Sequence, residues 1–188
     1  MAFFASDRER RLWLWVLAVV VAIYASLGYA PVLAGVLRQR GLLEATFVFC
    51  FLLVLATIVT KAFDARPRGV EIAIVLGVVA AFLMVLVRME MPEERTHLIE
   101  YGVLGLFIHE ALSERARHGR RVPLPPLLAI LATAALGTLD EVIQAVLPSR
   151  VFDPRDILFN VLAGTMSITA GAALAWTRRR VEARSAAG

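Results

Sequence analysis

The 188-residue chain has a single cysteine, Cys50, and a single lysine, Lys61, so its basic residues are almost all arginine. One cysteine cannot form an intramolecular disulfide, and it excludes a zinc site built from several thiolates. The 20 Lys and Arg residues are spread over short segments without a basic face or a nucleic-acid-binding motif. We therefore expect no nucleic-acid partner and no disulfide scaffold.

Long polar stretches are also missing, and apolar runs take their place. Hydrophobic residues make up 59% of the chain, and the mean hydropathy is +0.72, whereas soluble domains are roughly 45–50% apolar. A run of about 18 apolar residues is long enough to cross a hydrocarbon core of about 30 Å. The sequence predicts an all-α fold, a polytopic membrane helix bundle that forms one integral membrane domain over residues 1–188. About six spans are expected, at residues 12–30, 42–63, 70–87, 96–112, 124–147 and 156–176.

The distribution of basic residues predicts the orientation of these spans. If the N-terminus is cytoplasmic, 14 of the 20 Lys and Arg residues fall in the inner segments and 6 in the outer loops. An excess of basic residues on the cytoplasmic side is the usual pattern in multi-pass proteins. We expect a multi-pass protein of the inner (plasma) membrane with both termini in the cytoplasm.

Ionisable residues near the spans are the candidates for function, because a charged residue at the centre of a span costs about 2.5–3.5 kcal/mol on insertion scales. In the predicted topology, polar residues from the last three spans gather at the outer surface. They are Glu93, Glu94, Arg95, His97, Glu100, Tyr101, Asp140, Glu141, Gln144, Arg150, Asp153, Arg155, Asp156 and Asn160.

Helical spacing indicates that these polar residues face one another. Residues three or four positions apart share a helix face, as do His97 with Tyr101, Glu141 with Gln144, and Asp156 with Asn160. Three helices meeting at this depth would enclose a polar pocket that opens outward. Small residues allow helices to approach one another closely, and Gly102, Gly105 and Gly164 would do so here. For Asp153, which precedes Pro154, the pattern favours a helix cap.

Two stretches resemble the VanZ-like membrane protein family, a bacterial family linked to low-level resistance to the glycopeptide teicoplanin. The first, ERTHLIEYGVLGL, is similar to the family's His-x-x-x-Tyr segment; the second, LDEVIQAVLPSRVFDPRDILFNVLAG, is similar to its Glu-x-x-Gln, Arg and Asp-x-x-x-Asn-x-x-x-Gly signature. The resemblance places the signature region at residues 93–176. The signature positions would be His97, Tyr101, Glu141, Gln144, Arg150, Asp156, Asn160 and Gly164. This chain departs from many members in having Glu94 where they have a lysine.

The candidate site residues fall into two groups. Catalytic roles are expected for Glu141, as acid or base, and for His97, which could exchange protons with it. Substrate-binding roles are expected for Tyr101, Gln144, Arg150, Arg155, Asp156 and Asn160. The set contains no serine or cysteine nucleophile. A metal site made from His97, Glu141 and Asp156 is conceivable, but no ligand motif such as HExxH supports it, so we predict neither a metal nor a cofactor.

Three functions remain open on this pattern. The favoured one is a site that binds or modifies a cell-envelope amphiphile, with membrane lipids or a lipid-linked envelope molecule as the partner. The second is structural, a buried polar network that locks helices together. The third, transport, has less support, because transporter sites usually lie at the membrane midplane on broken helices.

Overall fold

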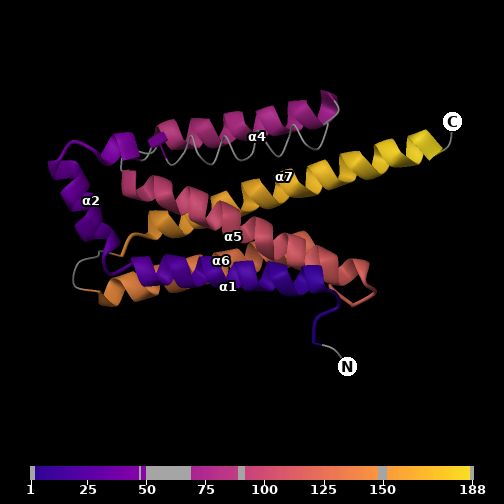
Figure 1. The fold of residues 1–188 in the computed structure, drawn as a ribbon, viewed down its shortest axis with the longest axis horizontal. Helices are drawn as coiled ribbons and strands as arrows, with labels where there is room; N and C mark the ends of the chain where they lie inside the picture. Colours follow the sequence, from indigo (N-terminus) through magenta and orange to yellow (C-terminus); the bar gives the residue numbers. More distant parts are fainter. Residues whose placement is uncertain (1–2, 47, 50–68, 89–91, 148–151, 187–188) are drawn as a thin grey trace.

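The computed structural model describes the chain except for residues 1–2, 47, 50–68, 89–91, 148–151 and 187–188 (Figure 1). Within the described residues the secondary structure is helical throughout, so the predicted all-α class is confirmed there. The helices are α1 (Asp7–Ser26), α2 (Ala30–Gln39), α4 (Gly69–Arg88), α5 (Pro92–Arg117), α6 (Pro125–Val146) and α7 (Pro154–Ala186). The predicted span at 42–63 lies mostly outside the described residues.

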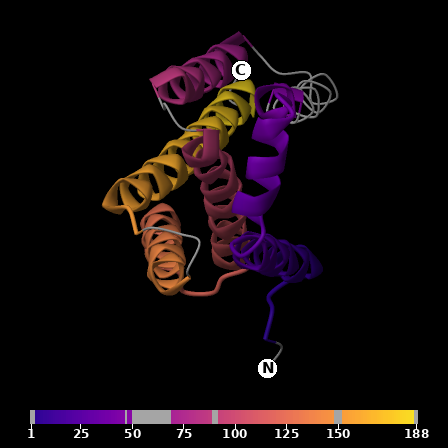
Figure 2. The same cartoon turned by 90° about the vertical axis from the view of Figure 1, so that its left-hand side faces the viewer.

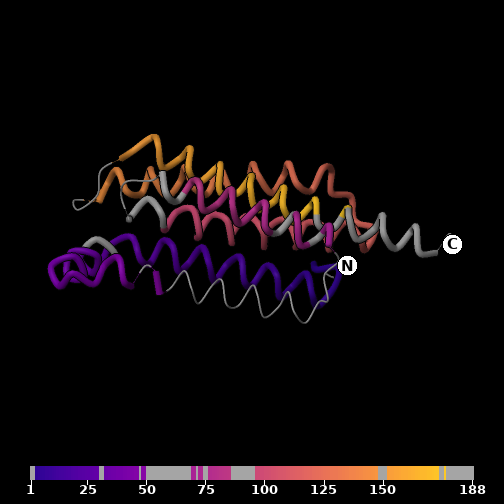
Figure 3. Tube along the Cα trace, turned by 90° about the horizontal axis from the view of Figure 1, so that it is seen from above, coloured from indigo at the N-terminus to yellow at the C-terminus, as the bar shows by residue number. Residues whose placement is uncertain are grey.

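Helix α5 is at the centre of the bundle. It packs against α7, α6 and α1, while α7 also contacts α6 and α4. The long helices run along one common axis, and α2 crosses one end of the bundle (Figures 1 and 3). Viewed along that axis, α5 is surrounded by α1, α6 and α7 (Figure 2). Any side chain that α5 directs toward these neighbours is therefore enclosed on several sides.

Helices α6 and α7 have the length and composition of membrane spans. Their apolar segments, Pro125–Val146 and Pro154–Ala173, have mean hydropathies of 1.6 and 1.3. Only 28% and 22% of these segments are buried in the protein, whereas the core helix of a soluble protein is mostly buried. Large apolar side chains face outward instead, including Leu131, Val142 and Leu158. Two helices that could cross a membrane are thus present among the described residues.

The chain between α1 and α2 differs from the predicted span at 12–30. Helix α1 ends at Ser26, and α2 begins at Ala30 with a proline in its first turn. Proline lacks a backbone N–H and favours the first turn of a helix, where that N–H has no intrahelical partner. The predicted outer loop that follows therefore contains the short helix α2.

Small residues bring α5, α6 and α7 into close contact. A Cβ added at Gly105 of α5 would lie 3.1 Å from the Cα of Gly164 in α7, and one added at Gly164 would lie 2.8 Å from Cγ2 of Thr133 in α6. Backbones can approach this closely only where side chains are small. The predicted close approach at these two glycines is confirmed.

The start of α1 is fixed to the end of α5 by an N-terminal ion-pair network. The network consists of Arg8, Glu9, Glu110, Glu114, Arg115 and Arg117. Its shortest pair joins Arg115 Nη1 to Glu9 Oε1 at 2.8 Å, and Arg8 reaches Glu110 at 3.0 Å. Because residues about a hundred positions apart meet here, the network sets the alignment of α1 along α5.

Glu9 is the buried member of this network, with no exposed surface. Its carboxylate accepts hydrogen bonds from the backbone N–H of Ala5 at 2.6 Å, from Arg115 at 2.8 Å and from the indole N–H of Trp13 at 3.3 Å. Burial by itself would raise the pKa of Glu9, but these hydrogen bonds outweigh it and hold the pKa below its ordinary value of 4.5. Glu9 is therefore ionised and holds the start of α1 against Arg115 of α5.

Candidate functional site

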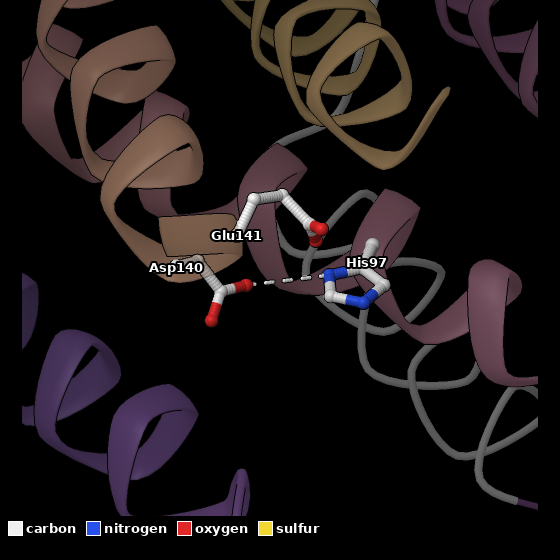
Figure 4. A group of neighbouring side chains, drawn as sticks. All are labelled: His97, Asp140 and Glu141. Atoms are coloured by element: carbon white, nitrogen blue, oxygen red, sulfur yellow. Dashed lines mark ion pairs between the residues drawn. The ribbon is translucent and has the colours of Figure 1, made fainter. Parts of the chain in front are cut away.

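An imidazole and three carboxylates meet where the start of α5, the end of α6 and the start of α7 come together. His97 Nδ1 lies 3.6 Å from Oδ2 of Asp140, and His97 Nε2 lies 3.9 Å from Oδ2 of Asp156. The carboxylates of Asp140 and Glu141 both point toward the imidazole (Figure 4). We call His97, Asp140, Glu141 and Asp156 the acid–histidine cluster.

The helical repeat of α6 explains why it supplies two carboxylates to one place. Its buried face carries Thr133, Gly137, Asp140, Glu141 and Gln144, which are spaced three or four residues apart except for the adjacent acidic pair. With 3.6 residues per turn, this spacing forms one stripe along the helix. Adjacent residues can both belong to it because α6 is covered by α5 and α7 together. The acidic pair thus faces the helix junction.

The carboxylate of Glu141 is held in place by hydrogen bonds to both of its oxygens. The side-chain amide of Gln144 donates to Oε1 at 3.1 Å, and the backbone N–H of Asp153 donates to Oε2 at 3.2 Å. Glu141 is fully buried, and Gln144 is 2% exposed. The predicted pair of Glu141 and Gln144 therefore forms one fixed unit at the end of α6.

The start of α7 has the predicted cap. Helix α7 begins at Pro154, and Oδ1 of Asp153 accepts a hydrogen bond from the backbone N–H of Arg155 at 2.8 Å. The predicted capping role of Asp153 is confirmed. Arg155 is exposed, unlike His97, Asp140 and Glu141, and Arg150, the other predicted basic ligand, lies outside the described residues.

Two tyrosines cover the inner side of the cluster. Tyr101, which is fully buried, donates to the backbone carbonyl of Leu136 at 3.5 Å, and Tyr24 of α1 donates to the same carbonyl at 3.0 Å. The rings of Tyr101 and His97 are nearly parallel, with centroids 6.1 Å apart. Tyr101 therefore lies beside the histidine, as its spacing predicts. Through Tyr24, α1 is the fourth helix, after α5, α6 and α7, to contribute a side chain here.

Asn160 borders the cluster from α7, one helical turn beyond Asp156. It is fully buried, and neither its Nδ2 nor its Oδ1 has a hydrogen-bond partner among the described residues. A Cβ added at Gly137 would lie 2.8 Å from Cβ and 3.0 Å from Nδ2 of Asn160. Buried amides are nearly always hydrogen bonded, so this side chain has capacity for a further ligand.

The burial of these side chains differs from the predicted open pocket. His97 is 4% exposed, and Asp140, Glu141 and Asn160 have no exposed surface. The Asp156 side chain is the most exposed of the cluster, at 16%. Hydrophobic neighbours on α1, α5, α6 and α7 enclose the site, so the polar residues form a closed cluster with access near Asp156.

A separate apolar groove lies between α4 and α7. Its volume is about 390 Å³, and its lining is Gly77, Val78, Ala81, Thr165, Met166, Thr169, Ala170 and Ala173. None of the predicted site residues lines this groove. The acid–histidine cluster and the groove are thus distinct features of the fold.

Two residues at the site were not predicted as functional. Asp140 was grouped with the outer polar residues but given no role, although it lies three residues after Gly137 and four before Gln144 on the buried face. That spacing could have identified it. Tyr24 gave no comparable signal, because its partner is a backbone carbonyl 112 residues away.

The arrangement can transfer protons or bind a cation. A carboxylate beside an imidazole can orient the ring and exchange protons with it, and carboxylate and imidazole groups are also common metal ligands. Comparisons with protein families, with curated proteins and with solved structures found no match for this chain, so the resemblance to the VanZ-like family stays a prediction.

Proposed function

We propose that this chain is a multi-pass protein of the bacterial plasma membrane whose acid–histidine cluster binds or modifies a cell-envelope amphiphile at the extracytoplasmic surface. The observation that carries the proposal is the convergence of His97, Asp140, Glu141 and Asp156, from three helices, at one end of an apolar bundle. A lipid-linked molecule whose polar head enters near Asp156 would match an apolar surface that ends at a polar centre.

The length of α5 supports a membrane-spanning arrangement. His97 near its start and Glu114 near its end are 17 residues apart, which corresponds to about 26 Å along a helix. This distance is close to the thickness of a hydrocarbon core, about 30 Å. The acid–histidine cluster and the N-terminal ion-pair network would then lie at opposite surfaces.

The ends of the bundle support the proposed orientation with both termini in the cytoplasm. The start of α1 and the end of α7 lie at the same end, opposite the cluster (Figures 1 and 3). Arginines gather there in the network and in the segment that follows α5. Basic residues favour the cytoplasmic side, so the cluster would face the envelope. The resemblance to the VanZ-like family, with its link to teicoplanin resistance, agrees with this position.

A structural role is the second candidate, and the hydrogen bond that joins the end of α6 to the start of α7 favours it. Oε2 of Glu141 accepts this bond from the backbone N–H of Asp153 at 3.2 Å, as expected of a helix-locking polar network. In that case the cluster would stabilise the junction of α5, α6 and α7 without binding a substrate. Transport has less support, because α5, α6 and α7 are continuous helices rather than the broken helices of many transporters.

Two substitutions separate the functional role from the structural one. Glu141→Gln preserves the size of the side chain but removes its charge and one of the two acceptor oxygens that bond to Gln144 and to the backbone of Asp153, and Asn160→Ala removes the buried amide. In a Gram-positive host made less susceptible to teicoplanin by this protein, each variant is expected to restore the susceptibility of cells that lack it. Glu110→Gln, which changes a partly exposed carboxylate at the other end of α5, is the matched control and should retain the phenotype.

The stability of the same variants decides the outcome. If Glu141→Gln and Asn160→Ala lose the phenotype but keep wild-type expression and melting temperature in detergent, the cluster is functional. If activity falls only in proportion to the amount of folded protein, the helix-locking role is correct and the proposed site is wrong.

A further inference from the structure

The acid–histidine cluster has the donor atoms and spacing of a metal site. One nitrogen of His97 and one carboxylate oxygen each of Asp140 and Glu141 all lie within 4.8 Å of one another. From this geometry we infer that the cluster binds one divalent transition-metal ion. The inference rests on the same residues as the proposed function and adds a cofactor to it.

The distance between His97 and Asp140 fits two ligands of one ion. Zinc bonds to histidine nitrogen and carboxylate oxygen are about 2.0–2.2 Å long, which places two tetrahedral ligands about 3.4 Å apart. Nδ1 of His97 and Oδ2 of Asp140 are 3.6 Å apart, beyond the usual range of a hydrogen bond. A carboxylate oxygen of Glu141 lies within 4.8 Å of the ligand atoms of both His97 and Asp140.

The second nitrogen of the histidine also faces a carboxylate. Nε2 of His97 lies 3.9 Å from Oδ2 of Asp156. A histidine that binds a metal through one ring nitrogen usually donates its other N–H to a carboxylate, which fixes the ring and its tautomer. Asp156 is therefore a positioning residue, while His97, Asp140 and Glu141 are the ligands.

The third ligand is oriented in the way metal-binding carboxylates usually are. Both oxygens of Glu141 accept hydrogen bonds, from Gln144 and from the backbone of Asp153. Outer hydrogen bonds of this kind orient the ligand before the ion binds. Since Gln144 and the cap of α7 hold it, Glu141 is positioned without any rearrangement of the helices.

Asn160 gives a second, independent indication of a ligand at this place. Its amide atoms are fully buried and have no hydrogen-bond partner among the described residues. Three protein ligands leave one position of a tetrahedral zinc ion for water or for another oxygen. Asn160, one turn from Asp156, could hydrogen bond that water or an oxygen of a bound amphiphile. Mixed imidazole and carboxylate ligands favour a first-row ion such as Zn²⁺ over Mg²⁺ or Ca²⁺.

Zinc binding to the full-length protein purified in detergent tests the inference without any envelope phenotype. After removal of metal with a chelator, the protein is titrated with Zn²⁺ in competition with a chromophoric chelator. One Zn²⁺ per chain is expected, with a rise in melting temperature. Co²⁺ as a spectroscopic probe is expected to give visible absorption from the same site.

Three variants identify the ligands and the positioning residue. His97→Asn and Glu141→Gln should weaken zinc binding at least about 100-fold and abolish the Co²⁺ spectrum, while Asp156→Asn should weaken it about 10–100-fold. His118→Asn is the matched control, because this histidine is partly exposed and lies beside Glu114 at the other end of α5. Its zinc affinity should equal that of the wild type.

The results distinguish this inference from the proposed function. An absence of stoichiometric Zn²⁺ and Co²⁺ binding, or equal affinity in wild type, His97→Asn and Glu141→Gln, would overturn the metal site. The proposed function could survive that result through the phenotype of Glu141→Gln. Conversely, a site that binds zinc in a protein whose Asn160→Ala and Glu141→Gln variants keep the phenotype would leave the metal assignment intact and remove the proposed function.

Discussion

Replacing Gly137 with alanine is expected to lower the free energy of unfolding by about 1–3 kcal/mol, the usual effect of overpacking a filled interior. The new Cβ would lie 2.8 Å from Cβ of Asn160, which is too close for any real contact. Since Cβ of Asn160 is fixed to the backbone, relief requires α6 and α7 to separate. Thermal unfolding in detergent is the measurement, with an expected decrease of several degrees in melting temperature.

Gly77→Ala is the matched control for this substitution. Gly77 lies within α4, and a Cβ there would meet no atom within 4 Å. Alanine favours a helix over glycine by about 1 kcal/mol, so this variant should be as stable as the wild type or more stable. Equal melting temperatures for Gly137→Ala and Gly77→Ala would show that the contact between α6 and α7 is looser than described.

Replacing Glu9 with alanine is expected to destabilise the protein by about 2–3 kcal/mol, because it leaves buried donors without an acceptor. Trp13 and the backbone of Ala5 would lose their partner, and Arg115 would lose its shortest ion pair. The effect should stay below that of a fully buried ion pair, since the Arg115 side chain is 31% exposed. Denaturation in detergent, compared with the wild type, measures it.

Asp7→Ala is the control, because Asp7 is acidic, lies in the same helical turn and has a side chain that is 79% exposed. Exposed ion pairs contribute about 0–1 kcal/mol, so this variant should resemble the wild type.

The pH dependence of stability gives a second test of the role of Glu9. The folded pKa of Glu9 lies below its ordinary value of 4.5. Its stabilising contribution is therefore complete above the ordinary pKa and is lost as the pH falls through the folded pKa. A Glu9→Gln variant with the same acid profile as the wild type would contradict this assignment.

The sequence predicted a helix's boundaries well where the helix begins and ends with its apolar segment. The boundaries expected at 70–87 and 124–147 match those of the helices α4 and α6 to within a residue or two, although of these two helices, in the part of the chain that the structure describes, only α6 has the length and composition of a membrane span. The expected spans 96–112 and 156–176 are shorter than α5 and α7, because these helices continue into arginine-rich segments that hydropathy excludes. Arginine is a good helix former, so the helix extends beyond its apolar part.

The sequence predicted which residues belong to the site better than it predicted their burial. Spacing alone indicated that Glu141 and Gln144 share a face, and the structure gives them a hydrogen bond. It could not indicate that the cluster is closed, because burial depends on how tightly α5, α6 and α7 pack. The three glycine contacts that set this packing join residues from different helices.

Glu9 shows why the N-terminal ion-pair network was missed. The basic residues around it were interpreted as a topology signal, and a single glutamate among them carries no local pattern. Its partner Arg115 is 106 residues away. Local periodicity can predict which face of a helix is apolar, but it cannot predict which distant charge will meet a buried carboxylate.

Site-directed labelling tests most directly whether the acid–histidine cluster faces the envelope. The single native cysteine allows a Cys50→Ala background, into which one cysteine is placed at Phe152, beside the cluster, or at Phe3, beside the N-terminal network. Both side chains are exposed, at 44% and 78%. With a membrane-impermeant maleimide, Phe152→Cys should react in intact spheroplasts, and Phe3→Cys only after the membrane is opened. Labelling of Phe3→Cys in intact spheroplasts, with Phe152→Cys protected until lysis, would place the cluster in the cytoplasm and contradict the proposal.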